Sequence, residues 1–155
     1  MTTVVIGIGN RTLSDDAVGC VVAERVGRTL GGNLAVEWRE VHTGGLRLME
    51  AMAGFDRAIL IDAIQTGASA PGTIVRLAAG GLAKTRNTFS SHDGSLRDAL
   101  AFGRHAGLKL PTEIRIWAIE AQDVTTFSER LTEPVERAAA ELVAEIAGEC
   151  SEAMR

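Results

Sequence analysis

The chain has 155 residues, of which 46% are hydrophobic and 23% are charged. These values are ordinary for a globular protein, and the length suits one buried core rather than two, so we expect a single domain over residues 1–155. The net charge of −4, with acidic and basic residues interspersed, argues against nucleic acid as a partner. No apolar run approaches the roughly 20 residues of a membrane span. No basic secretory n-region precedes the first strand, and Cys20 and Cys150 fit no disulfide framework, so we expect a cytoplasmic protein.

The first half of the chain alternates between apolar runs that predict strands and amphipathic stretches that predict helices. Continuous β-branched residues predict a buried strand at Thr3–Ile8. Ser14 or Asp15 is expected to cap a helix that runs to about Leu30, since both residue types accept hydrogen bonds from the N–H groups of a first turn. The next two elements are a strand at Leu34–Val41 and a helix at Leu46–Ala53.

The second half begins with the clearest central strand, Arg57–Ile64, in which Ala-Ile-Leu-Ile directly precedes Asp62. Because only a short connection separates it from the apolar run Thr73–Leu77, we expect these two strands to form an antiparallel hairpin. A polar loop over 78–94 follows. The remaining elements are a helix at Ser95–Gly107, a strand at Glu113–Ala121, and a helix from about Glu133 to Ala147 with Thr132 as its cap. This order predicts an α/β fold, a three-layer sandwich in which a twisted, mixed but mostly parallel five-stranded sheet lies between helices.

Three residues at separate loop exits of this sheet are candidates for a metal site: Asp16, Asp62 and His92. Open α/β sheets bind ligands beyond the carboxyl ends of their strands, and Asp62 follows the most hydrophobic run. Two carboxylates and an imidazole form an oxygen and nitrogen donor set suited to a transition metal. Each residue also has an ordinary role open to it: Asp16 in the first turn of a helix, Asp62 as a solvated strand end, and His92 as an exposed loop histidine.

Other motifs in the sequence are weaker. Gly7-Ile8-Gly9 supplies only the first two glycines of a dinucleotide-binding loop, and Asp15 and Asp16 would repel a pyrophosphate at that helix start. We expect Asp15 to offset the helix dipole. Cys20 is expected to be a small core residue and not a nucleophile, because nothing basic lies near it in the sequence.

Five short motifs occur in order along the chain: Gly7-Ile8-Gly9-Asn10, Asp15-Asp16-Ala17-Val18-Gly19, Thr43-Gly44-Gly45-Leu46, Ile61-Asp62-Ala63 and Ser90-Ser91-His92. Each is weak alone, but together at these separations they resemble the [NiFe]-hydrogenase maturation endopeptidases, from residue 3 to about residue 147. These enzymes remove a short C-terminal peptide from the precursor of the hydrogenase large subunit after nickel has been inserted. The resemblance implies that this chain is a peptidase whose partner is such a precursor.

The resemblance also implies roles for particular residues. The family's metal contacts are an acidic residue, an aspartate and a histidine, which fall by motif on Asp16, Asp62 and His92. A segment associated with substrate recognition falls on Thr43-Gly44-Gly45. The nickel is expected to arrive with the precursor, so that its presence gates cleavage. Asp16 or Asp62 is then the expected catalytic base, in an aspartic or a metal-assisted mechanism.

The sequence leaves two other functions open. One is a non-catalytic assembly factor that binds the nickel-loaded precursor through the same three residues. The other is a hydrolase of an unrelated substrate on the same sheet. Only the endopeptidase shortens the large subunit, so the mass of that subunit separates it from the assembly factor.

Overall fold

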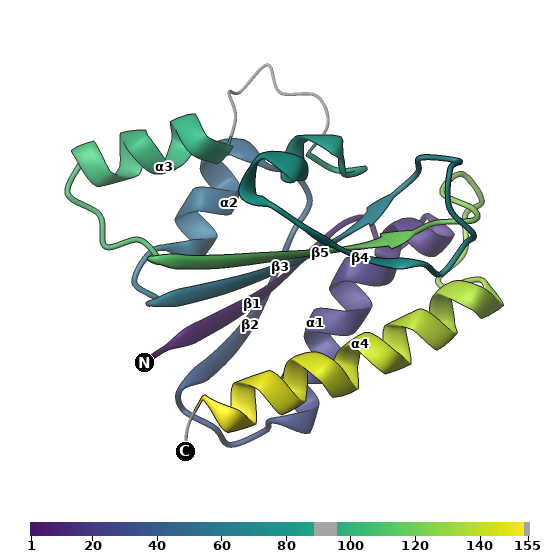
Figure 1. The fold of residues 1–155 in the computed structure, drawn as a ribbon, viewed down its shortest axis with the longest axis horizontal. Coiled ribbons are helices and arrows are strands. Elements are labelled where there is room, and N and C mark those ends of the chain that lie inside the picture. Colours follow the sequence, from purple (N-terminus) through teal and green to yellow (C-terminus); the bar gives the residue numbers. More distant parts are fainter. Residues whose placement is uncertain (89–95, 154–155) are drawn as a thin grey trace.

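A computed structural model describes residues 1–88 and 96–153 of the chain. Its centre is a five-stranded sheet with the strand order β2-β1-β3-β5-β4 (Figure 1). The pairings of β1 with β2, of β1 with β3 and of β3 with β5 are parallel, whereas β4 runs antiparallel to β5. The strands are β1 (Thr3–Ile8), β2 (Val36–Val41), β3 (Arg57–Ile64), β4 (Ile74–Leu77) and β5 (Glu113–Glu120). The predicted mixed, mostly parallel sheet is therefore confirmed.

Helices cover both faces of this sheet (Figure 1). One layer contains α1 (Val18–Thr29) and α4 (Glu133–Glu152), and the other contains α2 (Gly45–Met52) and α3 (Leu96–His105). Two short 3-10 helices, η1 (Ser14–Ala17) and η2 (Ala79–Lys84), lie in the connections. The predicted three-layer sandwich is confirmed. Among the described residues, no helix combines the length and the apolar character needed to cross a bilayer.

Strand β3 shows how the sequence produces this layering, since all of its residues are buried. Ile59 and Ile61 pack in the layer of α1 and α4, whereas Ala58 and Leu60 pack in the layer of α2 and α3. A parallel strand covered on both faces needs apolar side chains at successive positions, which explains the continuous hydrophobic run. The same alternation places the side chain of Asp62 on the face of Leu60.

The predicted antiparallel hairpin between the third and fourth strands is wrong. β4 pairs with β5 instead, with Ile74 opposite Ile119, so that β5 lies between β3 and β4. The connection from β3 to β4 passes the end of β5, where the N–H groups of Thr66 and Gly72 donate to the side chain and the carbonyl of Glu120, respectively. A short connection can therefore pass over one strand at its end, which spacing along the sequence does not reveal.

The start of the first helix also differs from the prediction. Residues 14–17 form η1, and the α-helix begins at Val18 without a side-chain cap. Ser14 Oγ donates to the carbonyl of Arg130 over 3.1 Å. Neither Ser14 nor Asp15 caps α1, because both side chains hold the loop between β5 and α4 against this turn.

Candidate active site

Two glycines let helix α1 approach the carboxyl ends of β1 and β3. A Cβ atom on Gly7 would lie 2.2 Å from the carbonyl oxygen of Gly19, and one on Gly19 would lie 2.2 Å from the carbonyl oxygen of Ile61. Neither position accepts a side chain. The pairing of β1 with β3 ends at Gly7 and Ile61, so Asp62 is the first residue of β3 beyond it. The close packing brings η1, which carries Asp16, toward this point.

Asp62 is fully buried, and its carboxylate accepts hydrogen bonds from Ala63 and Asn87. Oδ1 accepts the N–H of Ala63 over 2.8 Å and Nδ2 of Asn87 over 2.7 Å, and Oδ2 accepts the N–H of Asn87 over 3.0 Å. Burial raises the pKa of Asp62 to about 7, because the cost of desolvating the ionised form outweighs the hydrogen bonds from Asn87, Thr85 and Ala63 that lower this pKa. Such a carboxyl exchanges a proton near neutral pH, as a general acid or base must.

Asp16 lies in η1 and is also buried, with 2% of its surface exposed. Its Oδ1 accepts Nδ2 of Asn87 over 2.9 Å, and Nε of Arg86 lies 3.9 Å from the same oxygen. Gly9 leaves room for this turn, since a Cβ atom there would lie 2.1 Å from the carbonyl oxygen of Asp16. The structure thus brings Asp16 and Asp62, two predicted site residues from distant parts of the chain, to one side-chain amide.

Asn87 is the residue of this site that the sequence analysis missed. One amide nitrogen donates to both carboxylates, and the backbone N–H of the same residue donates to Asp62. The N–H of the neighbouring Arg86 donates to the carbonyl of Ala63 over 2.8 Å, which ties segment 85–88 to the end of β3. No motif marks Asn87. The only signal is its place in a long polar connection, a kind of segment that often carries functional residues.

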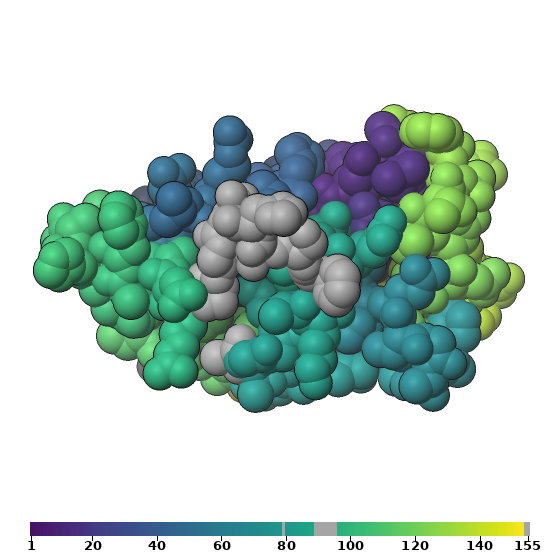
Figure 2. All heavy atoms as spheres, turned by 90° about the horizontal axis from the view of Figure 1, so that it is seen from above, coloured from purple at the N-terminus to yellow at the C-terminus, as the bar shows by residue number. Residues whose placement is uncertain are grey.

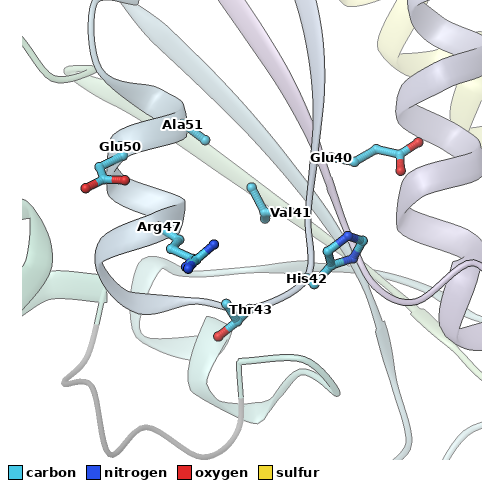
Figure 3. A pocket seen from close by; sticks show the side chains of 7 residues that line it. All are labelled: Glu40, Val41, His42, Thr43, Arg47, Glu50 and Ala51. Atoms are coloured by element: carbon cyan, nitrogen blue, oxygen red, sulfur yellow. The ribbon is translucent and has the colours of Figure 1, made fainter.

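The glycine loop predicted to recognise the substrate contacts the segment that holds these carboxylates. A Cβ atom on Gly44 would lie 3.3 Å from the Cβ of Thr88, the residue after Asn87. Nδ1 of His42, which directly precedes the loop, donates to the carbonyl of Gly9 over 2.8 Å. The loop borders a surface pocket of about 430 Å³ between the end of β2 and the start of α2 (Figure 3).

His92, the third residue of the predicted metal site, lies outside the described residues. Within residues 1–88 and 96–153, no cluster of three or more His, Cys, Asp or Glu side chains is arranged to hold a metal ion. Asp16 and Asp62 are the predicted ligands that this part of the chain contains. Their oxygen atoms suit a divalent cation, and two such ligands leave most coordination positions of an ion to other donors.

Asp15 lies in the first turn of η1 and has a structural role that the sequence did not reveal. Its fully buried carboxylate accepts the N–H groups of Gln122, Asp123 and Thr132 and the hydroxyl of Thr132, over 2.8 to 2.9 Å. Thr132 is the N-cap residue of α4, as predicted, but its hydroxyl donates to Asp15 and makes no capping hydrogen bond to the helix. Figure 2 shows the connection between β1 and α1 (purple) side by side with the loop between β5 and α4 (yellow-green). Asp15 holds these two connections together.

Cys20 is a core residue, as predicted. It is fully buried, and burial raises the pKa of its thiol to about 12. A thiol with that pKa is protonated at neutral pH and is therefore a poor nucleophile. Although Cys20 is close to Asp16 in the sequence, its side chain packs in the core and takes no part in the site.

A family model described as hydrogenase maturation protease matches residues 22–149, well over half of the chain. The chain belongs to the hydrogenase maturation protease family. The resemblance seen in the sequence motifs is thus confirmed, and the predicted class of enzyme, a peptidase, is confirmed at the level of the family.

Individual relatives agree with this membership. The hydrogenase 2 maturation protease of Escherichia coli (strain K12) is 33% identical over 108 residues, which span 69% of this chain and 66% of that relative, slightly under two thirds of its length. The E. coli hydrogenase-maturating endopeptidase HybD superposes with a TM-score of 0.77 at 28% identity, covering 99% of this chain and 94% of that one. The [NiFe] hydrogenase maturation protease HybD from Thermococcus kodakarensis, at 22% identity and a TM-score of 0.74 over 97% and 99% of the two chains, shares the fold.

Proposed function

We propose that the chain is an endopeptidase that removes a C-terminal peptide from the nickel-loaded precursor of a [NiFe]-hydrogenase large subunit. The observation that carries this proposal is the convergence of Asp16 and Asp62 on the amide of Asn87 at the carboxyl edge of the sheet. Membership of the maturation protease family supports the class of reaction. The names of the E. coli relatives support a hydrogenase as the target.

In this proposal the nickel belongs to the substrate. Asp16 and Asp62 supply carboxylate oxygens to it, His92 supplies an imidazole, and the precursor's own groups fill the remaining positions. Two desolvated carboxylates gain strongly from a nearby cation, because Coulomb interactions are larger where water is excluded. Tight binding then requires a precursor that already carries nickel, so metal insertion precedes cleavage.

Asp62 is the proposed base for peptide hydrolysis. Water attacks the carbonyl carbon of the scissile bond, and Asp62 takes a proton from the water as the new C–O bond forms. The same proton passes to the nitrogen of the leaving peptide as the C–N bond breaks. A carboxyl whose pKa is about 7 suits both transfers at neutral pH. Nickel on the carbonyl oxygen or on the water would polarise it further, so an aspartic and a metal-assisted route use the same carboxylate.

The proposed place of this reaction is the cytoplasm, where the precursor is the expected partner. Cys20 and Cys150 are both unpaired and buried. Unpaired cysteines fit a reducing compartment, in which structural disulfides are rare.

The proposed function is tested by the mass of the precursor. Purified large-subunit precursor, with and without nickel, is incubated with the chain and analysed by intact-protein mass spectrometry. Loss of the C-terminal extension from the nickel-loaded precursor alone supports the proposal. An unchanged mass combined with nickel-dependent capture of the precursor supports the assembly factor instead, and an unchanged mass without capture contradicts both.

A further inference from the structure

Arg86 is a charged residue of the site that has no role in the proposed proton transfer. Its Nε lies 3.9 Å from Oδ1 of Asp16, beyond hydrogen-bond distance, and 42% of its side chain is exposed. Among residues 1–88 and 96–153, it is the only basic side chain within ion-pair distance of Asp16 or Asp62. The structure therefore places one positive charge beside the two buried carboxylates.

The backbone of Arg86 is held in place, whereas its side chain is not. The N–H of Arg86 donates to the carbonyl of Ala63 over 2.8 Å, and the next residue, Asn87, donates to both carboxylates. A partly exposed ion pair without a hydrogen bond adds little to the free energy of folding. The guanidinium is thus fixed near Asp16 by its position in the chain, and it can move away into solvent when another cation arrives.

A positive charge at this place opposes the binding of a second cation. An ion between Asp16 and Asp62 is attracted by the two carboxylates and repelled by the guanidinium, and the repulsion grows with the net charge of the ion. A free Ni²⁺ ion carries its full charge. In the proposed function, the nickel of the precursor already has ligands, and each anionic donor among them lowers its net charge. Arg86 therefore disfavours the free ion more strongly than the nickel of the precursor.

We propose that Arg86 is a specificity-determining residue that keeps free divalent metal ions out of the site and so reserves it for the nickel of the precursor. This inference rests on the proposed function. Two carboxylates suit any divalent cation, so a free ion bound between them would block the precursor. Specificity is a difference between two affinities, and a charge that repels the wrong ligand is one way to create it.

The first part of the test measures binding of NiCl₂ to the full chain by isothermal titration calorimetry. We expect the Kd of Arg86→Gln to be about tenfold lower than that of the wild type, because a nearby like charge is removed. A merely structural role of Arg86 predicts the opposite, since a distorted site binds metal more weakly. Added salt should narrow the difference between the two proteins, because the guanidinium is partly exposed and its charge is screened.

Three variants show whether the gain comes from charge at this site. Arg86→Lys keeps the charge and should bind within about twofold of the wild type. Arg104→Gln makes the same change in net charge at an exposed position in the last turn of α3, which leads to the amino end of β5 at the other edge of the sheet (Figure 1), and it should leave the Kd unchanged. Asp16→Asn, added to Arg86→Gln, should abolish the gain.

The second part asks whether free metal competes with the precursor. Cleavage of the nickel-loaded precursor is followed by intact mass with increasing NiCl₂, for the wild type and for Arg86→Gln, each relative to its own uninhibited rate. Half-inhibition of Arg86→Gln is expected at a concentration about tenfold lower than for the wild type, in line with its Kd. An Arg86→Gln chain that cleaves no precursor shows that Arg86 acts on the substrate itself, and this result overturns the inference.

The calorimetry separates this inference from the proposed function. A Kd of Arg86→Gln equal to or above that of the wild type overturns the inference, as does a gain that Arg86→Lys shares or that survives Asp16→Asn. In each of these cases, cleavage by the wild-type chain still supports the proposed function. A wild-type chain that cleaves no precursor overturns the proposed function, and the inference with it.

Discussion

Nδ2 of Asn87 donates to Oδ1 of Asp62 over 2.7 Å, and the same nitrogen donates to Asp16. One neutral side chain thus sets the spacing of two buried carboxylates that would otherwise repel each other. It does so from segment 85–88, which is itself held on the end of β3 by a backbone hydrogen bond. The two acidic groups are therefore positioned before any substrate arrives, which lowers the cost of binding a cation between them.

Replacing Asn87 by alanine should impair the site without unfolding the protein. Removing a residue that orients metal-binding groups typically costs about 10- to 100-fold in metal affinity or activity, and we expect a loss of that size in processing of the nickel-loaded precursor. The rate is measured by intact mass against time. Asn33→Ala, in the connection between α1 and β2 at the other end of the sheet, is the control. A rate for Asn87→Ala within twofold of this control contradicts the positioning role.

The buried carboxyl of Asp62 should make stability depend on pH. Its pKa rises from 3.8 to about 7 on folding, so between these values the native state holds a proton that the unfolded state releases. The free energy of unfolding should therefore fall as pH rises through this window, with a contribution from Asp62 of up to about 1.4 kcal/mol per pH unit. Urea unfolding at several pH values measures the slope. Asp62→Asn should lack this contribution, and parallel curves for the variant and the wild type would show that the assignment is wrong.

The close contact of α1 with the sheet predicts opposite effects for two glycines. In Gly19→Ala the new Cβ meets the carbonyl oxygens of Ile61 and Ile8 at 2.2 and 2.6 Å, so we expect a loss of about 3 kcal/mol or more in the free energy of unfolding. Gly148, in α4, has open space around it. Gly148→Ala should be neutral or stabilise by up to about 1 kcal/mol through helix propensity. Equal effects of the two variants in urea unfolding would contradict this packing.

Replacing the neighbouring residues Asp15 and Asp16 by asparagine is expected to have different effects: the first should lower stability and the second should abolish processing. Asp15→Asn places an N–H donor against the donors of Gln122, Asp123 or Thr132, so it should lower the free energy of unfolding by about 2 kcal/mol or more. Below its melting temperature this variant should still process the precursor. Asp16→Asn should remain folded and lose processing. Thermal melts and the mass assay, run on both variants, would refute the division of roles if Asp16→Asn kept its activity.

The fold was predictable to the extent that it follows from local patterns. The apolar runs at 3–8 and 57–64 predicted both ends of β1 and β3 correctly, because strands buried on both faces have continuous hydrophobic sequences. The pairing of β4 was not predictable in this way. It depends on β5, which comes later in the chain and lies between β3 and β4. The sequence of residues 65–77 does not indicate this position of β5.

The site was predictable where position in the sheet determines chemistry. Asp62 stands out as a carboxylate at the end of the most hydrophobic run, and its burial is what raises its pKa. Asn87 and the true role of Asp15 could not be found this way, because each acts through partners that only the folded chain brings near. An asparagine in a polar loop and an aspartate at a helix start are both ordinary in a sequence. Their meaning comes from long-range contacts.

The central claim is that Asp62 transfers the proton when the nickel-loaded precursor is cut. The most direct test is the intact mass of that precursor after incubation with Asp62→Asn, with circular dichroism verifying that the variant is folded. The account predicts full-length precursor under conditions in which the wild-type chain converts all of it to the shortened form. A shortened product formed by the folded variant at the wild-type rate would contradict it.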